Sequence, residues 1–175
     1  MPFTPFHMGP GIAIKAVLQG SFSLMVFGWA QIIMDIQPLL VMITGEGHLH
    51  GFSHTFVGAA LLSVVAALSG KHLAQWGLKW LGINRFMATH ISWPVAFFSA
   101  AIGCATHVLL DAIMHHDVEP FYPVSLTNPL LNLLSNPALH QLCLYSGLIG
   151  GAVFFVVAWW QRRRQKQFKE TSHPQ

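Results

Sequence analysis

Long apolar stretches separated by short polar segments make up most of the chain. The clearest stretch runs from Ala138 to Trp160 and is followed almost at once by three consecutive arginines. A helix of that length measures about 34 Å, which is enough to cross the roughly 30 Å hydrocarbon core of a bilayer. Ile91–Met114 and the shorter Phe52–Leu68 are further apolar stretches. All three are therefore predicted to span a membrane.

The N-terminal part predicts a broken pair of helices. Phe22–Ile43 is long enough to span, but Asp35 and Pro38 interrupt it, and Pro38 is expected to break the helix. Gly11–Leu18 is apolar but too short to cross alone. We therefore interpret Gly9–Met34 as a helical hairpin with a short first arm. Farther along, residues 72–81 predict an interfacial amphipathic helix.

The composition changes the picture from apolar helices to a membrane protein. The chain has 175 residues, of which 53% are hydrophobic and 9% charged, and its mean hydropathy is +0.51. Soluble domains average about 25% charged residues, so a disordered chain is excluded and a water-soluble fold is disfavoured. We predict an all-α polytopic integral membrane bundle of about four to five membrane helices in the lipid bilayer. Residues 1–161 would form one transmembrane domain, and residues 162–175 a basic cytoplasmic tail.

The charges predict an orientation and exclude one class of partner. Five of the nine Lys and Arg residues lie between Arg162 and Lys169, and no basic face suits nucleic acid. The positive-inside rule therefore places the C-terminus in the cytoplasm. Loop 70–90 then lies inside, and loops 44–52 and 116–137 lie outside. Apart from Lys15, loop 70–90 contains all of the remaining basic residues. Every acid except Glu170 falls on the outer side.

Histidine is the anomaly in the composition, because eleven histidines outnumber the six acids. With the predicted topology, four separate segments bring histidine or carboxylate groups to one membrane face. Ionisable groups at membrane depth are costly and are functional candidates by default. The candidate metal ligands are His7, Asp35, His50, His54, His107, Asp111 and His115.

The sharpest pattern is His107, Asp111 and His115, which are spaced four residues apart in one predicted helix. Such residues share a helix face, but the three would extend about 12 Å along the axis, too far for one ion. An adjacent pair can chelate one metal, and the trio can serve two metals that share Asp111. Nitrogen with oxygen suits zinc, manganese or iron. A hydrogen-bonded structural pair is the alternative, and His116 is an alternative to His115.

The second pattern is Gly47-His48-Leu49-His50-Gly51-Phe52-Ser53-His54. Ser53 is predicted to cap the next helix, which places His54 in its first turn. The helix dipole disfavours the imidazolium there and keeps His54 in the neutral form that binds metal. His48 and His50 can alternatively be polar loop residues.

Two further candidates lie near the N-terminus. Asp35 needs a cation, and only a metal or a histidine is predicted nearby. His7 is either a ligand or an interfacial side chain.

The block Leu49-His50-Gly51-Phe52-Ser53-His54, followed by Thr106-His107-x-x-x-Asp111, resembles the predicted membrane-bound metal-dependent hydrolases, sometimes described as LexA-regulated. The opening Met-Pro-Phe-Thr-x-x-His is similar to a related family of membrane proteins, and the resemblance spans roughly residues 1–125. It implies that His7, Asp35, His54, His107 and Asp111 carry the family's site. The family's first histidine of the block falls at Leu49 and its arginine at His50. His48 or His50 would then supply the missing imidazole.

The expected function is a metal-dependent hydrolase in the bacterial inner (plasma) membrane, acting on lipid-type esters or phosphoesters near the outer face. The cofactor would be a divalent transition metal, zinc first and manganese second, as one or two ions. Asp117 and Glu119 are candidate bases by position alone. The alternatives are a metal-binding or metal-transporting protein, a haem protein, which the carboxylates disfavour, and a structural scaffold. The sequence leaves the oligomeric state open.

Overall fold

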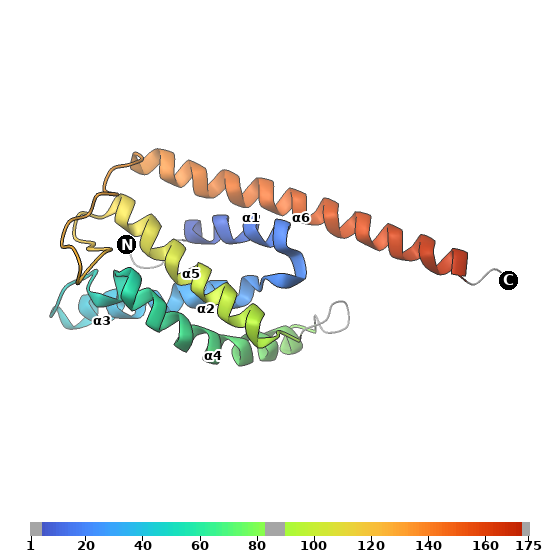
Figure 1. The fold of residues 1–175 in the computed structure, drawn as a ribbon, viewed down its shortest axis with the longest axis horizontal. Coiled ribbons are helices and arrows are strands. Elements are labelled where there is room, and N and C mark those ends of the chain that lie inside the picture. Colours follow the sequence, from blue (N-terminus) through green and yellow to red (C-terminus); the bar gives the residue numbers. More distant parts are fainter. Residues whose placement is uncertain (1–4, 83–89, 173–175) are drawn as a thin grey trace.

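The fold is a bundle of helices, taken from a computed structural model that describes residues 5–82 and 90–172 (Figure 1). No strand occurs in these ranges, and the all-α prediction is confirmed. The α-helices are α1 (Met8–Leu18), α2 (Leu24–Met34), α3 (Ile36–Thr44), α4 (Phe56–Trp80), α5 (Trp93–Met114) and α6 (Asn136–Ser172). Three short 3₁₀ helices accompany them: η1 (Pro5–His7), η2 (Gln19–Ser21) and η3 (Phe52–His54).

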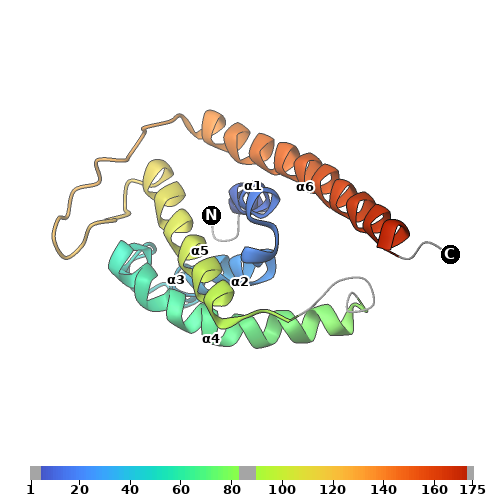
Figure 2. The same ribbon diagram turned by 45° about the vertical axis from the view of Figure 1, so that its right-hand side comes forward.

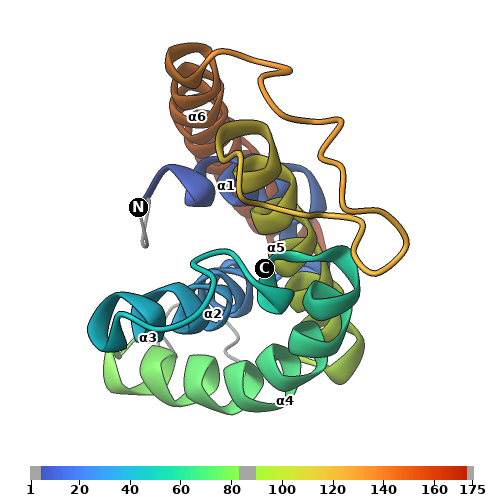
Figure 3. The same cartoon turned by 90° about the vertical axis from the view of Figure 1, so that its left-hand side faces the viewer.

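Four helical segments of the described chain are long and apolar enough to cross a membrane, and they agree with the four predicted spans. They are Leu24–Thr44, Phe56–Trp80, Trp93–Met114 and Asn136–Gln161. Helices α2, α4 and α5 pack into the main core, and α1 packs against α6 (Figures 2 and 3). Many large apolar side chains on α4 and α6 remain exposed, as expected for helices that face lipid.

The predicted hairpin with a short first arm is confirmed, and the break in the next span lies at Asp35. Lys15 at the end of α1 donates through Nζ to the carbonyl oxygens of Gln19 and Phe22, which satisfies backbone groups at the turn. Pro38 has no N–H to give the carbonyl of Met34, and its ring crowds that carbonyl. The helix therefore breaks ahead of the proline, and Asp35 ends α2.

The prediction of a separate interfacial helix over residues 72–81 is wrong, because α4 continues through this segment to Trp80. The segment just before it packs against the bundle: Trp29 donates through Nε1 to Ser69 Oγ at 2.9 Å. The Nζ of Lys71 lies 3.8 Å from the centre of the Trp93 ring on α5. These contacts give the indole of Trp29 and the ammonium group of Lys71 partners inside the bundle.

A close approach of α1 and α6 positions the N-terminus. A Cβ on Gly9 would lie 1.9 Å from the backbone oxygen of Cys143, and one on Gly150 would lie 2.5 Å from Cα of Ala13. Small residues let membrane helices approach in this way. The contact holds α1 so that His7, which precedes it, reaches α5 at Asp111.

Charge is sorted between the two ends of the bundle within the described residues. Lys15, Lys71, Lys79 and the described arginines of α6 belong to the end at which α4 finishes and α5 begins. The acids gather where α3 and α5 finish and α4 begins, at the left of Figure 1. Arg85 and the side chains of Arg162, Lys166, Lys169 and Glu170 lie outside the described part. Helix α6 continues into the predicted tail, and the cytoplasmic position of the C-terminus stays a prediction.

Candidate metal centre

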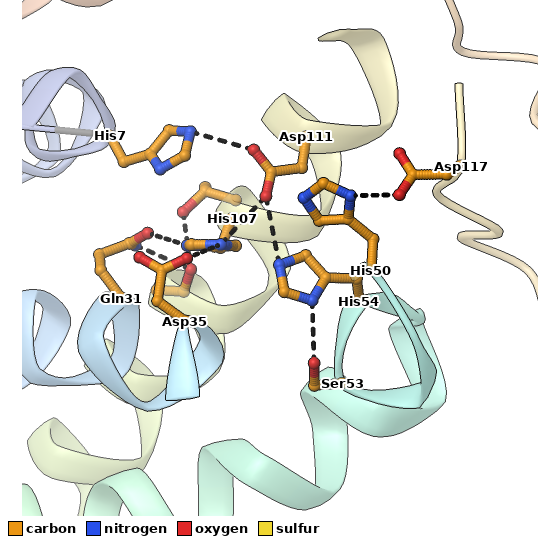
Figure 4. Close-up of polar contacts among 11 residues, drawn as sticks. His7, Gln31, Asp35, His50, Ser53, His54, His107, Asp111 and Asp117 are labelled. Atoms are coloured by element: carbon orange, nitrogen blue, oxygen red, sulfur yellow. Dashed lines mark hydrogen bonds and ion pairs between the residues drawn. The ribbon is translucent and has the colours of Figure 1, made fainter. Parts of the chain in front are cut away.

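The ionisable side chains converge at the acidic end of the bundle, where four chain segments meet (Figure 4). Helix α5 supplies two of them, and the other segments are η1, the end of α2 and the loop that includes η3. We call the most deeply placed set the inner group. It consists of His7, Asp35, His54, His107 and Asp111.

Asp111 is the centre of the inner group. Its Oδ2 lies 3.2 Å from Nε2 of His54 and 3.2 Å from Nε2 of His107, and its Oδ1 lies 3.4 Å from Nε2 of His7. Asp35 Oδ1 lies 3.4 Å from the same Nε2 of His107. His54 and His107 are fully buried, and Asp111 is 4% exposed. Two carboxylates therefore face one buried imidazole nitrogen.

Gln31 determines which nitrogen of His107 carries the hydrogen. The amide nitrogen of Gln31 donates to the carbonyl oxygen of Gly103 at 3.0 Å, which fixes the orientation of the amide. Gln31 Oε1 then faces Nδ1 of His107 at 2.7 Å. An amide oxygen only accepts, so Nδ1 must be the donor. In the neutral imidazole, the lone pair then lies on Nε2, which faces Asp35 and Asp111.

The Nε2 atoms of His54 and His107 are buried and have no aligned hydrogen-bond partner, although Asp111 Oδ2 is 3.2 Å from each. Ligand atoms that point at a common cation lie close to one another without being aligned for a hydrogen bond, as these atoms do. Two buried carboxylates around one ring nitrogen need a positive charge between them, which either a proton on Nε2 of His107 or a metal ion would supply. The donor set therefore fits a metal ion, with Nδ1 held by an outer partner as is usual for metal-bound histidine.

A second set of ligand types lies next to the inner group, and we call it the outer group. It consists of His50, His115 and Asp117. Nδ1 of His50 lies 2.9 Å from Oδ2 of Asp117, and its ring stacks on His115 with centroids 4.5 Å apart. One ligand atom from each of the three can lie within 4.8 Å of the others. His50 forms a similar set with His54 and Asp111, so it links the two groups.

Burial favours the neutral form of three of the histidines, His7, His54 and His115. Burial lowers the pKa of His7 to about 4, and burial also lowers the pKa of His54 and of His115. Burial alone would raise the pKa of Asp117, but the hydrogen bond with His50 keeps it below its usual value. Neutral imidazoles and ionised carboxylates are the forms that metals bind.

Two local predictions around His54 are wrong. Thr55, not Ser53, caps α4, because its Oγ1 accepts from the N–H of Gly58 at 2.8 Å. His54 therefore lies in η3, before the first turn of α4, and burial rather than the helix dipole keeps it neutral. Ser53 Oγ instead contacts Nδ1 of His54 at 2.9 Å.

The structure brings all seven predicted ligands together and separates two alternatives. His50 is buried in the cluster, whereas His48 is exposed and belongs to none of the candidate metal sets of the described residues. His115 lies with the outer group instead of sharing a site with His107, in agreement with the axial distance predicted from the helix. His50 is therefore the residue placed to supply the missing imidazole.

Sequence reasoning missed Gln31 and did not recognise Asp117 as a ligand. Gln31 had a signal: it is the only polar side chain of α2 apart from the Trp29 indole, and it precedes Asp35 by four residues. Such spacing places both on one helix face. Asp117 had no signal in the spacing, because a loop after α5 brings it to His50.

Comparison with known proteins identifies the family of the chain. The family model described as YdjM inner membrane protein matches residues 12–169, a range that holds every candidate ligand except His7. Neither the curated proteins nor the solved structures include a match to this chain.

Proposed function

The chain belongs to the YdjM inner membrane protein family, and we propose that it is a membrane-bound metal-dependent hydrolase. The observation that supports this proposal most strongly is the arrangement of Gln31, His107 and the two carboxylates. A hydrogen bond on Nδ1 leaves Nε2 of a fully buried imidazole facing Asp35 and Asp111. A bound metal ion would neutralise the two carboxylates that surround this nitrogen.

The ligand set supports a transition metal, with zinc first and manganese second. Imidazole nitrogen with carboxylate oxygen suits both ions. A zinc site uses about four ligands, or three with water at a catalytic site, and the two groups together offer more than that. One or two ions would therefore bind. A metal in such a site lowers the pKa of bound water to about 7 and polarises an acyl or phosphoryl oxygen.

The protein side chains would orient the site and limit access of water to it. Gln31 and Ser53 hold the rings of His107 and His54 through their Nδ1 atoms. His54 and His107 are fully buried and Asp111 is 4% exposed, so bulk water has little access to the inner group. Access remains from the outer group, where the side chain of Asp117 is 38% exposed. A substrate would therefore approach past His50 and Asp117.

The position of the site supports a lipid-type ester or phosphoester as substrate. Apart from Asp35, the candidate ligands lie at or near the ends of membrane-spanning helices, where headgroups lie in a bilayer. The aqueous side of this end would be the outer one if the C-terminus is cytoplasmic. Two reporter fusions test this orientation. A reporter that works only in the cytoplasm should be active when it is fused after Gln175. A reporter that works only outside the membrane should be active when it is inserted near Leu126. Reversed results would move the site to the cytoplasmic face.

The function itself is tested on the purified full-length protein in an uncharged detergent. Elemental analysis should find one or two transition-metal ions per chain. Ester and phosphoester lipids should be hydrolysed, a chelator should abolish turnover, and zinc or manganese should restore it. Metal without turnover on any ester would leave a metal protein that is not a hydrolase. The absence of metal would overturn the proposal.

A metal transporter is the second candidate, and the break between α2 and α3 favours it. Asp35 lies at this break within a membrane-spanning segment, and transporters often place ligands at such broken helices. Vesicles containing the protein distinguish the two functions, since a transporter would accumulate labelled zinc and a hydrolase would not. Haem is disfavoured, because two carboxylates lie within 3.4 Å of Nε2 of His107. These carboxylates occupy the space that a haem would need in order to bind this nitrogen.

A further inference from the structure

A cavity of about 370 Å³ lies directly beside the outer group. His50 and Asp117 form the side of the cavity that adjoins the candidate metal centre. Glu119 and the aromatic rings of Phe52 and Tyr122 also line it. The volume falls within the range of small-molecule sites, and it is large enough for a lipid headgroup. The cavity is therefore placed to receive the part of a substrate next to the bond at the metal centre.

The lining of the cavity favours a cation. It contains two carboxylates, the rings of Phe52 and Tyr122 and two histidines, and no Lys or Arg is among its described residues. Asp117 already contacts His50 at 2.9 Å, whereas no ion pair engages Glu119 in the described chain. Aromatic faces and a carboxylate together attract ammonium groups, both by cation–π interaction and by charge.

The N–H groups at the start of α4, which would favour an anion, are largely occupied. The N-terminus of α4 adjoins the cavity through Thr55, and free N–H groups at a helix start attract anions. Here the N–H of Phe56 donates to the carbonyl oxygen of Pro120 at 2.8 Å. Those of Gly58 and Ala59 donate to the side chain and the carbonyl of Thr55. The helix start therefore leaves few free donors for an anion, and the metal centre would be the better site for an anionic group.

We propose that the cavity beside His50 binds the ammonium group of a zwitterionic headgroup, with Glu119 as counter-charge and Phe52 and Tyr122 as aromatic contacts. The inference rests on the proposed function in one respect: the ester or phosphoester group of the lipid whose ammonium group fills the cavity would lie at the metal centre. It narrows the substrate class to lipids whose headgroup carries an ammonium group, such as choline or ethanolamine. Purely anionic lipids would fill the cavity poorly.

The test measures binding of choline to purified, chelator-treated protein in an uncharged detergent by equilibrium dialysis. The matched probe is the uncharged isostere of choline, in which carbon replaces nitrogen. Choline should bind about tenfold more tightly than the isostere, because only choline gains the cation–π and charge interactions. Glu119→Gln and Tyr122→Leu should each weaken choline binding severalfold, and Tyr122→Phe should retain it. Glu46→Gln, which changes an exposed acid outside the cavity lining, is the control.

Three outcomes would overturn the inference. One is equal binding of choline and its isostere, and another is unchanged binding in both Glu119→Gln and Tyr122→Leu. The third is tighter binding of glycerol phosphate than of choline in the metal-free protein. Since metal is removed for the measurement, these outcomes leave the metal centre untouched. If the metal proposal is wrong, elemental analysis of the untreated protein would find no metal, while choline binding would remain.

Discussion

The inner and outer groups use the same ligand types in different surroundings. In the inner group, His54 and His107 are fully buried, and each ring is held through Nδ1 by a neighbouring side chain. In the outer group, His50 is held by Asp117, whose side chain is 38% exposed beside an open cavity. Burial fixes ligands in place, while exposure gives access to water and substrate. In the proposed hydrolase, the inner group would hold the metal and the outer group would admit the substrate.

The largest effect is expected from the inner group. Asp111→Asn keeps the shape of the side chain but removes the charge shared by three histidines. It should lower bound metal to a small fraction and reduce turnover by orders of magnitude, as should His107→Ala and His54→Ala. His48→Ala and His72→Ala are the controls and should keep the metal. Elemental analysis and a circular dichroism spectrum separate lost metal from lost folding. Full metal content in all three inner variants would refute the site.

A smaller effect is expected from the outer group. Asp117→Asn and His115→Ala should remove only the more accessible ion, or reduce turnover while the inner ion stays bound. His116→Ala is a matched control, because it neighbours His115 but belongs to no candidate set in the described chain. The measurements are the number of metal ions per chain and the rate of turnover in each variant. If the outer variants lost all metal as the inner variants do, the two groups would form one site instead of two.

A still smaller effect is expected from the side chain that orients His107. Gln31→Leu removes the acceptor of the Nδ1 hydrogen and should weaken metal binding about 10–100-fold without abolishing it. Ser69→Ala removes a hydrogen bond from Trp29 of the same helix, far from the site, and should leave metal affinity unchanged. Titration with a zinc indicator measures both. A Gln31→Leu affinity equal to that of the wild type would exclude the orienting role.

The smallest effect is a pH dependence of the metal-free protein. The pKa of His7 is about 4 in the fold and 6.5 as the ordinary value, because burial disfavours the charged ring. Between these values, the unfolded chain binds a proton that the folded chain does not, so stability falls as the pH drops from 6.5 toward 4. His7→Gln should make the melting temperature less steep in this window, and His48→Gln should not. An unchanged slope would place His7 outside the buried cluster.

The membrane helices could be predicted because length and hydropathy alone decide whether a segment crosses a bilayer. The helix over Trp93–Met114 is the clearest case, and its four-residue spacing also brought His107 and Asp111 to one face. Helix ends were harder to predict. Thr55 rather than Ser53 caps α4, and α4 runs on past Leu68, because contacts such as that of Lys71 with Trp93 decide where a helix can continue.

The sequence by itself determined that histidines and carboxylates would gather at one end, since the order and direction of the spans place them there. Only the tertiary structure decided which of them meet. Asp117 reaches His50 through a loop fold, and Gln31 reaches His107 across two packed helices. Such contacts join residues far apart in the chain, so no periodicity records them. Periodicity reports which face of one helix a residue occupies, and packing alone decides what lies opposite that face.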